Sequence, residues 1–320
     1  MELKPNAETQ SLINVVNRFF PGKVTVQLVG HMQSGYVRHD QAQTVQDGKN
    51  IMIQIRDLTA PNYTATHELL HLLMVLRGFP QVYFSLTTGR PQLDVQLKAM
   101  GMELYDIVAH FVVVAEQRKH HLITPEIEKM YLKGIYATIN PEPSGNKLDN
   151  EMEVRLSTLL DAMIFYGSHF KQVASQFNRD FPKSMAGARK LYRIITAKPT
   201  DSPFGMRRNV VKLFKAYDDQ LKQWNLPPLQ NLAFTTLSSV FSEHQLRLQV
   251  GQLFTIYRSE LRTAKNRRQA YVGFSKVDHQ NSFVIPGPFN RNQSAQFLNR
   301  LNHKSVHDLF KKLKMPFIIR

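Results

Sequence analysis

The sequence predicts an α+β fold, with a small sheet packed on a helix near the N-terminus and a mainly α-helical region after it. Residues 23–30 and 51–58 alternate apolar and polar side chains, which is the period of a half-buried strand. Residues 8–20 carry apolar side chains at helical spacing and end before Pro21 and Gly22. From residue 152 to about residue 265 the spacing is mostly helical.

The same signals place the other elements in order. Residues 34–45 are a candidate second strand, followed by a turn at residues 46–50. Pro61 begins a helix, and the Gly78–Pro80 segment ends it. The remaining expected elements are helices over residues 91–119 and 124–137, a final helix or helix pair over residues 293–314, and short strands over residues 269–276 and 281–290.

The composition excludes several kinds of site. The chain has 320 residues and no cysteine, so disulfides, cysteine-based zinc fingers and a cysteine nucleophile are impossible. Any metal ion must therefore be held by His, Asp or Glu. The first ten residues are polar, and no apolar run reaches the ~18 residues that span a membrane, so we expect a cytoplasmic protein without membrane association.

The positive charge is concentrated in the second part of the chain. Residues 1–120 hold 11 Lys and Arg against 10 Asp and Glu, whereas residues 121–320 hold 30 against 15. Residues 140–151 are rich in Pro, Gly and Asn, which is typical of a linker. We therefore expect a domain over residues 1–139, a linker over residues 140–151 and a basic, mainly helical region over residues 152–320.

The segment 62–80 contains His67-Glu68-Leu69-Leu70-His71, an H-E-x-x-H motif. Positions i and i+4 share one face of a helix, so the imidazoles of His67 and His71 can hold one metal ion. Glu68 lies about 100° around the helix, where it can act as general base on a water molecule that zinc activates. The flanking residues are apolar, and polar groups buried among them need partners, which a metal supplies.

The strand at residues 51–58 and the helix with His67, Glu68 and His71 resemble the core of the zincin metallopeptidases. The chain is broadly similar to the compact ImmA/IrrE-like, gluzincin-like group within them. This resemblance covers about residues 8–120 and implies a zincin-like N-terminal domain, a Zn²⁺ cofactor and hydrolysis of a peptide bond. It also implies a third zinc ligand on the next long helix.

The candidates for this third ligand are Glu103, Asp106 and His110, which share one face of the helix over residues 91–119. The gluzincin resemblance favours Glu103, because the ligand there is a Glu, followed one turn later by an Asp that orients a zinc-bound histidine. Asp106 follows Glu103 by three residues instead of the common four. His110 and Asp106 therefore stay open as ligands, and an internal Asp106–His110 pair is a further alternative.

We accordingly expect a zinc metallopeptidase that acts on a cytoplasmic protein or peptide substrate, with Glu68 as base and then acid. The alternative is a nucleic-acid- or protein-binding factor whose metal site is structural or vestigial. Basic clusters with interleaved aromatic residues in 152–320 allow contact with nucleic acid or with an acidic protein. The same residues are also compatible with ordinary exposed helix faces.

Overall fold

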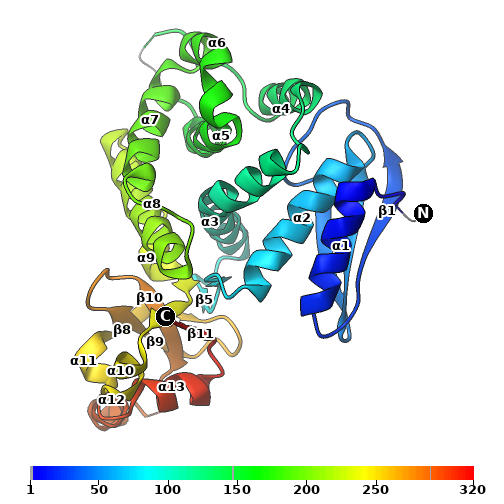
Figure 1. The fold of residues 1–320 in the computed structure, drawn as a ribbon. Helices are drawn as coiled ribbons and strands as arrows, with labels where there is room; N and C mark the ends of the chain where they lie inside the picture. Colours follow the sequence, from blue (N-terminus) through cyan, green and yellow to red (C-terminus); the bar gives the residue numbers. More distant parts are fainter. Residues whose placement is uncertain (1–2, 146–147, 289) are drawn as a thin grey trace. The chain divides into compact units, whose positions relative to one another are not determined.

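The computed structural model describes residues 3–145, 148–288 and 290–320 and has a mixed α+β fold, with 54% helix and 19% strand. This confirms the α+β part of the expected fold class. The chain forms two compact units (Figure 1). Unit 1 comprises Met1–Gly78 and Ala109–Lys190, and unit 2 comprises Phe79–Val108 and Leu191–Arg320.

The two units do not follow the boundaries that we expected. Residues 152–190 cluster with the N-terminal part of the chain, and residues 79–108 cluster with the C-terminal part. The described residues of the expected linker, 140–145 and 148–151, contain no helix or strand and lie within unit 1; residues 146–147 are outside the described part. The segment therefore connects two parts of one unit.

Unit 1 contains a sheet and most of the helices of the first 190 residues. Its elements are α1 (Ala7–Phe19), β1 (Val24–Met32), β2 (Ala42–Asp47), β3 (Asn50–Asp57), α2 (Pro61–Leu76), α4 (Pro125–Thr138), α5 (Met152–Tyr166), the 3-10 helix η1 (Gly167–Gln172) and α6 (Ala174–Asp180). The helices α3 (Pro91–Lys119) and α7 (Pro182–Thr196) contribute residues to both units.

The sheet of unit 1 has the strand order β1-β3-β2, with β1 parallel and β2 antiparallel to β3. In β3 the buried side chains of Ile53 and Ile55 alternate with more exposed ones, as its sequence predicts. Helices α1 and α2 lie side by side against this sheet (Figure 1). The expected second strand is shorter than predicted, because residues 33–41 form a loop before β2 begins at Ala42.

Helix α2 begins with Pro61 in its first turn, and the chain turns at Gly78, which has φ 76°. Both ends agree with those predicted from the sequence. Proline is favoured in the first turn of a helix, and a residue in the left-handed conformation commonly ends one. The helix is buried around most of its circumference, including Ala65, Leu69 and Leu73. Its polar residues must therefore find partners inside unit 1.

Unit 2 combines helices with small sheets. Its elements are β4 (Val82–Tyr83), β5 (Leu86–Thr87), α8 (Pro203–Gln223), α9 (Asn231–Phe234), β6 (Thr236–Leu237), β7 (Ser239–Phe241), α10 (Glu243–Arg247), α11 (Val250–Leu253), β8 (Phe254–Thr263), β9 (Gln269–Ser275), β10 (Asn281–Pro286), η2 (Arg291–Gln293), α12 (Ser294–Asn302), α13 (Val306–Leu313) and β11 (Phe317–Ile319). The largest sheet has the order β10-β9-β8-β5.

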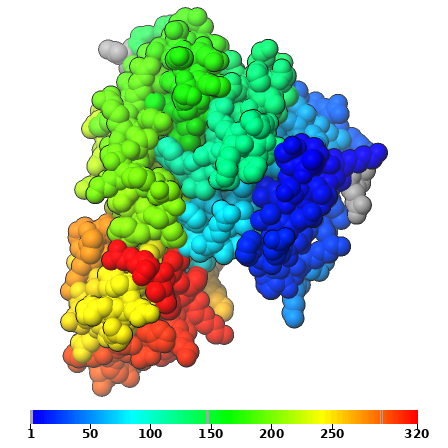
Figure 2. Space-filling model, viewed as in Figure 1, coloured from blue at the N-terminus to red at the C-terminus, as the bar shows by residue number. Residues whose placement is uncertain are grey.

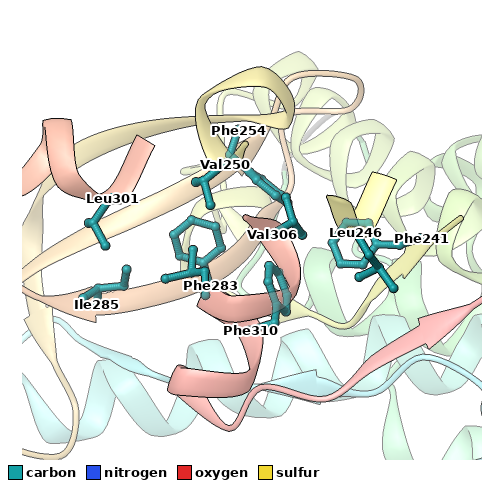
Figure 3. Packing of buried hydrophobic residues seen from close by; sticks show 10 residues of the cluster. Phe241, Leu246, Val250, Phe254, Phe283, Ile285, Leu301, Val306 and Phe310 are labelled. Atoms are coloured by element: carbon teal, nitrogen blue, oxygen red, sulfur yellow. The ribbon is translucent and has the colours of Figure 1, made fainter. Parts of the chain in front are cut away.

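The expectation of helix up to about residue 265 is wrong for residues 254–263, which form strand β8. β8 pairs with β9 in antiparallel orientation along most of its length, and its Phe254 packs in a core with Phe283 and Phe310 (Figure 3). This strand forms because it pairs with another strand, and a local sequence pattern carries no information about that pairing. Strands β9 and β10 confirm the existence of the two later strands, but β10 ends at Pro286, four residues before the predicted end, and Phe289 lies outside the described residues.

In the described part of the chain, no helix combines the length and the apolar character that crossing a membrane requires.

Candidate metal centre

His67 and His71 lie on adjacent turns of α2, and their Nε2 atoms are 3.2 Å apart. Two nitrogens that bind one tetrahedral zinc at about 2.0–2.1 Å lie about 3.3–3.4 Å apart. The rings are inclined to each other by 63°, so both can direct a ring nitrogen toward one point. The H-E-x-x-H pair thus has the separation and orientation of two ligands of a single metal ion.

Gln117 sets the tautomer of His67. Its Nε2 donates to the carbonyl of Tyr63 and to the hydroxyl of Thr66, at 3.2 Å each, which directs its Oε1 toward His67 Nδ1 at 3.4 Å. An amide oxygen only accepts, so Nδ1 of His67 carries the proton and Nε2 keeps its lone pair. Gln117 is fully buried and lies on α3, two turns after His110.

His110 reaches the same cluster from α3. Its Nδ1 donates to Asp161 Oδ1 at 2.6 Å, and its Nε2 is buried without a hydrogen-bond partner among the described residues. A buried ring nitrogen without a partner is costly in a folded protein. The ring of His110 lies 4.9 Å from that of His67 and 5.3 Å from that of His71. A metal ion between the three rings would satisfy this atom.

His39 is a fourth histidine in the cluster, and the sequence patterns did not single it out. Its Nδ1 lies 3.0 Å from Asp161 Oδ2, and its Nε2 lies 3.4 Å from the hydroxyl of Tyr63. His39, His67 and His110 have ring nitrogens within 4.8 Å of one another, which is close enough for a common ion. Distance alone therefore allows His39 as a ligand in place of His71.

The ring planes separate the two possible ligand sets. The rings of His39 and His67 are stacked, with centroids 4.4 Å apart and planes 10° apart. Nitrogen lone pairs lie in the ring plane, so two stacked rings cannot both point at one ion. The planes of His67, His71 and His110 are instead inclined to one another by 59° to 73°. The ring orientations favour these three as ligands, whereas the nitrogen separations single out His39, His67 and His110.

The loop that carries His39 is held from two sides. Asp57, which is almost fully buried, accepts a hydrogen bond from Gln41 Nε2 at 2.9 Å. The backbone N–H of Val37 donates to the carbonyl of Met130 in α4 at 3.1 Å. Gly134 permits this approach, because a Cβ there would lie 2.1 Å from the carbonyl oxygen of Val37. The loop therefore presents His39 in a defined place.

Asp161, on α5, is the acceptor that His39 and His110 share. It is almost fully buried and also accepts a hydrogen bond from the hydroxyl of Tyr131 at 2.8 Å. Burial by itself raises the pKa of Asp161, but His110 and His39 outweigh it and hold the pKa well below its usual value. The ionised carboxylate fixes the proton of both rings on Nδ1, so each Nε2 can act as a lone-pair donor.

Burial keeps the histidines neutral. It lowers the pKa of His67 and of His71 well below the ordinary value, and the neighbouring histidines lower both further. Burial also lowers the pKa of His110, against the opposing effect of Asp161. Neutral imidazole is the form that binds a metal. The lowered pKa values of His67, His71 and His110 therefore favour the form of these three rings that binds a metal.

Glu68 lies next to this cluster. The side chain is half-buried, and burial raises its pKa to about 7, against the opposing effects of His39 and of a hydrogen bond from the Thr44 side chain. Thr44 belongs to β2, which is an edge strand among the described strands of its sheet. A carboxyl group that titrates near neutral pH can both accept and donate a proton.

The other two predicted ligand candidates, Glu103 and Asp106, belong to unit 2, whereas the histidine cluster belongs to unit 1. Glu103 is exposed and Asp106 is half-buried, whereas His110 is 3% exposed. Glu103 precedes His110 by seven residues, which is about 10 Å along a helix axis. The structure therefore brings together His67, His71 and His110 from the predicted candidates, with Glu68 beside them, and the choice of the third ligand stays a prediction.

Comparison with known proteins adds no further assignment. No protein-family model matches the chain, and neither the search of curated proteins nor the search of solved structures finds a similar protein.

Proposed function

We propose that this protein binds zinc through His67, His71 and His110. The observation that carries this proposal is the buried, unpartnered Nε2 of His110 beside the Nε2 pair of the H-E-x-x-H motif. Asp161 and Gln117 hold the ligand rings through Nδ1, as the surrounding residues of metal sites commonly do. Zinc held by three histidines would polarise a carbonyl group and lower the pKa of a water molecule to about 7.

We further propose hydrolysis of a peptide bond. Glu68 accepts the proton of the attacking water and later donates it to the leaving amine, for which a pKa of about 7 is well suited. The edge strand β2 offers unpaired backbone groups beside Glu68, and an extended peptide can add to such an edge. These features support the zincin resemblance and a protein or peptide substrate.

The alternative, a structural metal site, needs a fourth protein ligand, because structural zinc sites are closed. His39 is the residue nearest to that role. Its ring stacks on His67, however, and its two nitrogens contact Asp161 and Tyr63. This arrangement favours an open site with three protein ligands.

The variant Glu68→Gln tests the mechanism. It removes the base without changing a ligand, so we expect one zinc per chain, measured by elemental analysis, and a loss of hydrolysis of about 10²–10⁴-fold. Hydrolysis is read by mass spectrometry as new peptide termini in a peptide library digested from whole-cell protein, so the assay covers many candidate substrates at once.

Wild-type protein and His67→Ala serve as the matched controls, because only the second should lose zinc. Cleavage by Glu68→Gln at the wild-type rate would reject Glu68 as base. One bound zinc in the wild type without any cleavage would reject the peptidase proposal and favour the structural role.

A further inference from the structure

The hairpin formed by β8 and β9 carries a concentration of positive charge at its turn. We define the basic hairpin as residues 257–268. It contains Arg258, Arg262, Lys265, Arg267 and Arg268, with Glu260 as the only acidic residue. All of its residues belong to unit 2, whereas the candidate metal centre belongs to unit 1.

Most of this charge is exposed and unpaired. Arg258, Arg262, Lys265 and Arg267 are exposed, and none of the four forms an ion pair in the described part of the chain. The hydrogen bonds of Arg258 and Arg262 go to neutral groups, the Gln269 side chain and the carbonyl of Arg267. The positive charge is therefore available to an anionic partner.

The turn is closed by its own backbone. The N–H of Thr263 donates to the carbonyl of Arg268, and the N–H of Arg267 donates to the carbonyl of Thr263, both at 2.9 Å. The N–H of Ala264 is bound by the carbonyl of Ser85 at 2.9 Å. A turn that is already ordered loses little backbone entropy when its side chains bind a partner.

An exposed aromatic residue lies at the start of the basic hairpin. Tyr257 is 59% exposed, and its ring lies 6.0 Å from that of Phe274. Strand β5 pairs with β8 only at Arg262 and Thr263, so β8 has a free edge around Tyr257 and Arg258 in the described residues. Side chains from both faces of the strand flank that edge.

We propose that the basic hairpin binds single-stranded nucleic acid along its length, from the free edge around Tyr257 and Arg258 to the turn that carries Lys265 and Arg267. The four exposed cations contact successive phosphates, and Tyr257 stacks on an unpaired base. Basic side chains that follow a backbone beside an exposed aromatic ring are the usual elements of single-strand binding without sequence preference. A duplex keeps its bases stacked and offers nothing to Tyr257, which is why we choose the single strand. This inference does not depend on the metal centre.

The test measures binding of the full-length protein to a fluorescent single strand of about 15 thymidines, over a range of salt concentrations. The charge variant combines Arg258→Gln, Lys265→Gln and Arg267→Asn. Asn is chosen at position 267 because φ is 53° there, which Asn tolerates. We expect affinity to fall at least tenfold and the slope of log K against log salt to become shallower by about 2, since each phosphate contact contributes about 0.7.

A second charge variant is the matched control. Lys311→Gln, Lys312→Gln and Lys314→Asn remove the same charge from α13 and the residue after it, and all three lysines are exposed. The C-terminal segment that contains α13 is red in Figure 2. Position 314 also has φ 53°, so the substitutions are alike in kind. We expect less than a threefold loss for this variant. An equal loss in both variants would mean diffuse charge attraction and would overturn the proposal.

Tyr257→Ala separates the single strand from the duplex. We expect at least a fivefold loss of affinity for the single strand, because one stacked base is worth about 1–3 kcal/mol, and no change for a duplex of equal length. Tighter binding of the duplex, with no effect of Tyr257→Ala on either probe, would overturn the assignment. Unchanged far-ultraviolet circular dichroism of each variant shows that it is folded.

Discussion

A single carboxylate governs the protonation of two rings in this cluster. Asp161 accepts from Nδ1 of His110 and lies 3.0 Å from Nδ1 of His39, while Tyr131 donates to the same group. The proton positions of both imidazoles thus depend on the two oxygens of one carboxylate, Oδ1 for His110 and Oδ2 for His39, which accept and never donate. His110 can offer a lone pair at Nε2 because Asp161 holds the proton of this ring on Nδ1.

Replacing Asp161 by Asn tests this dependence. One oxygen becomes an NH₂ donor, so one of the two rings must move its proton to Nε2. We expect zinc affinity, measured by competition with a chromogenic chelator, to fall about 10–100-fold. Tyr131→Phe is the control, because it removes one hydrogen bond and leaves both histidine contacts intact. An Asp161→Asn protein with wild-type zinc affinity would contradict the role given to Asp161.

The choice of third ligand also belongs to single residues. We expect His110→Ala to lower zinc affinity at least a hundredfold, since it removes one of three ligands, and Glu103→Ala and Asp106→Ala to change it less than twofold. Zinc titration of the three variants, each checked for folding by circular dichroism, measures this. Loss of zinc in Glu103→Ala with retention in His110→Ala would instead assign the ligand as the zincin resemblance does.

The part of the site that could be predicted is the part that is local in sequence. His67, Glu68 and His71 lie within five residues, and helical geometry alone relates their side chains. Asp161 lies 51 residues from His110 in sequence, and only the packing of α5 against α3 brings the two together. The one signal in the sequence was an Asp inside the otherwise apolar stretch of α5. His39 lies in a loop, where no periodic pattern exists.

At the scale of elements, helices with their own start and stop residues were predicted within one or two positions. Helix α3 (Pro91–Lys119) has the expected bounds, and α4 (Pro125–Thr138) begins one residue later than expected, after the Thr124 cap. Strand β8 was missed because its hydrogen bonds come from β9 and β5. Two helices with well-predicted bounds, α2 and α3, carry all three proposed ligands. Thr44 lies on β2, which is shorter than predicted, and Asp161 lies on α5, for which the sequence predicted helix but no bounds.

The whole molecule divides its chemistry between the two units. The four histidines of the cluster, Glu68 and Asp161 lie in unit 1, and the basic hairpin lies in unit 2. The linker composition of residues 140–151 suggested a boundary that the contacts do not follow, because Arg155 binds that segment to unit 1 through Asp149 and the carbonyl of Asn140. Composition reports local flexibility, whereas membership of a unit depends on contacts distant in sequence.

Zinc removal should therefore loosen the two units unequally. A bound ion stabilises the state that binds it, by about 4 kcal/mol at a free concentration a thousandfold above the Kd. We expect hydrogen–deuterium exchange to accelerate in α2, in residues 109–119 of α3 and in α5 when a chelator strips the protein. These segments supply the ligands and Asp161, so local opening there should cost less free energy without the ion. Strands β8–β10, in unit 2, should exchange at the same rate with and without zinc.

His67→Ala is the control and should show no difference between zinc and chelator in any segment. Equal acceleration in β8–β10 would contradict a centre confined to unit 1, and unchanged exchange in α2 would contradict the metal centre itself.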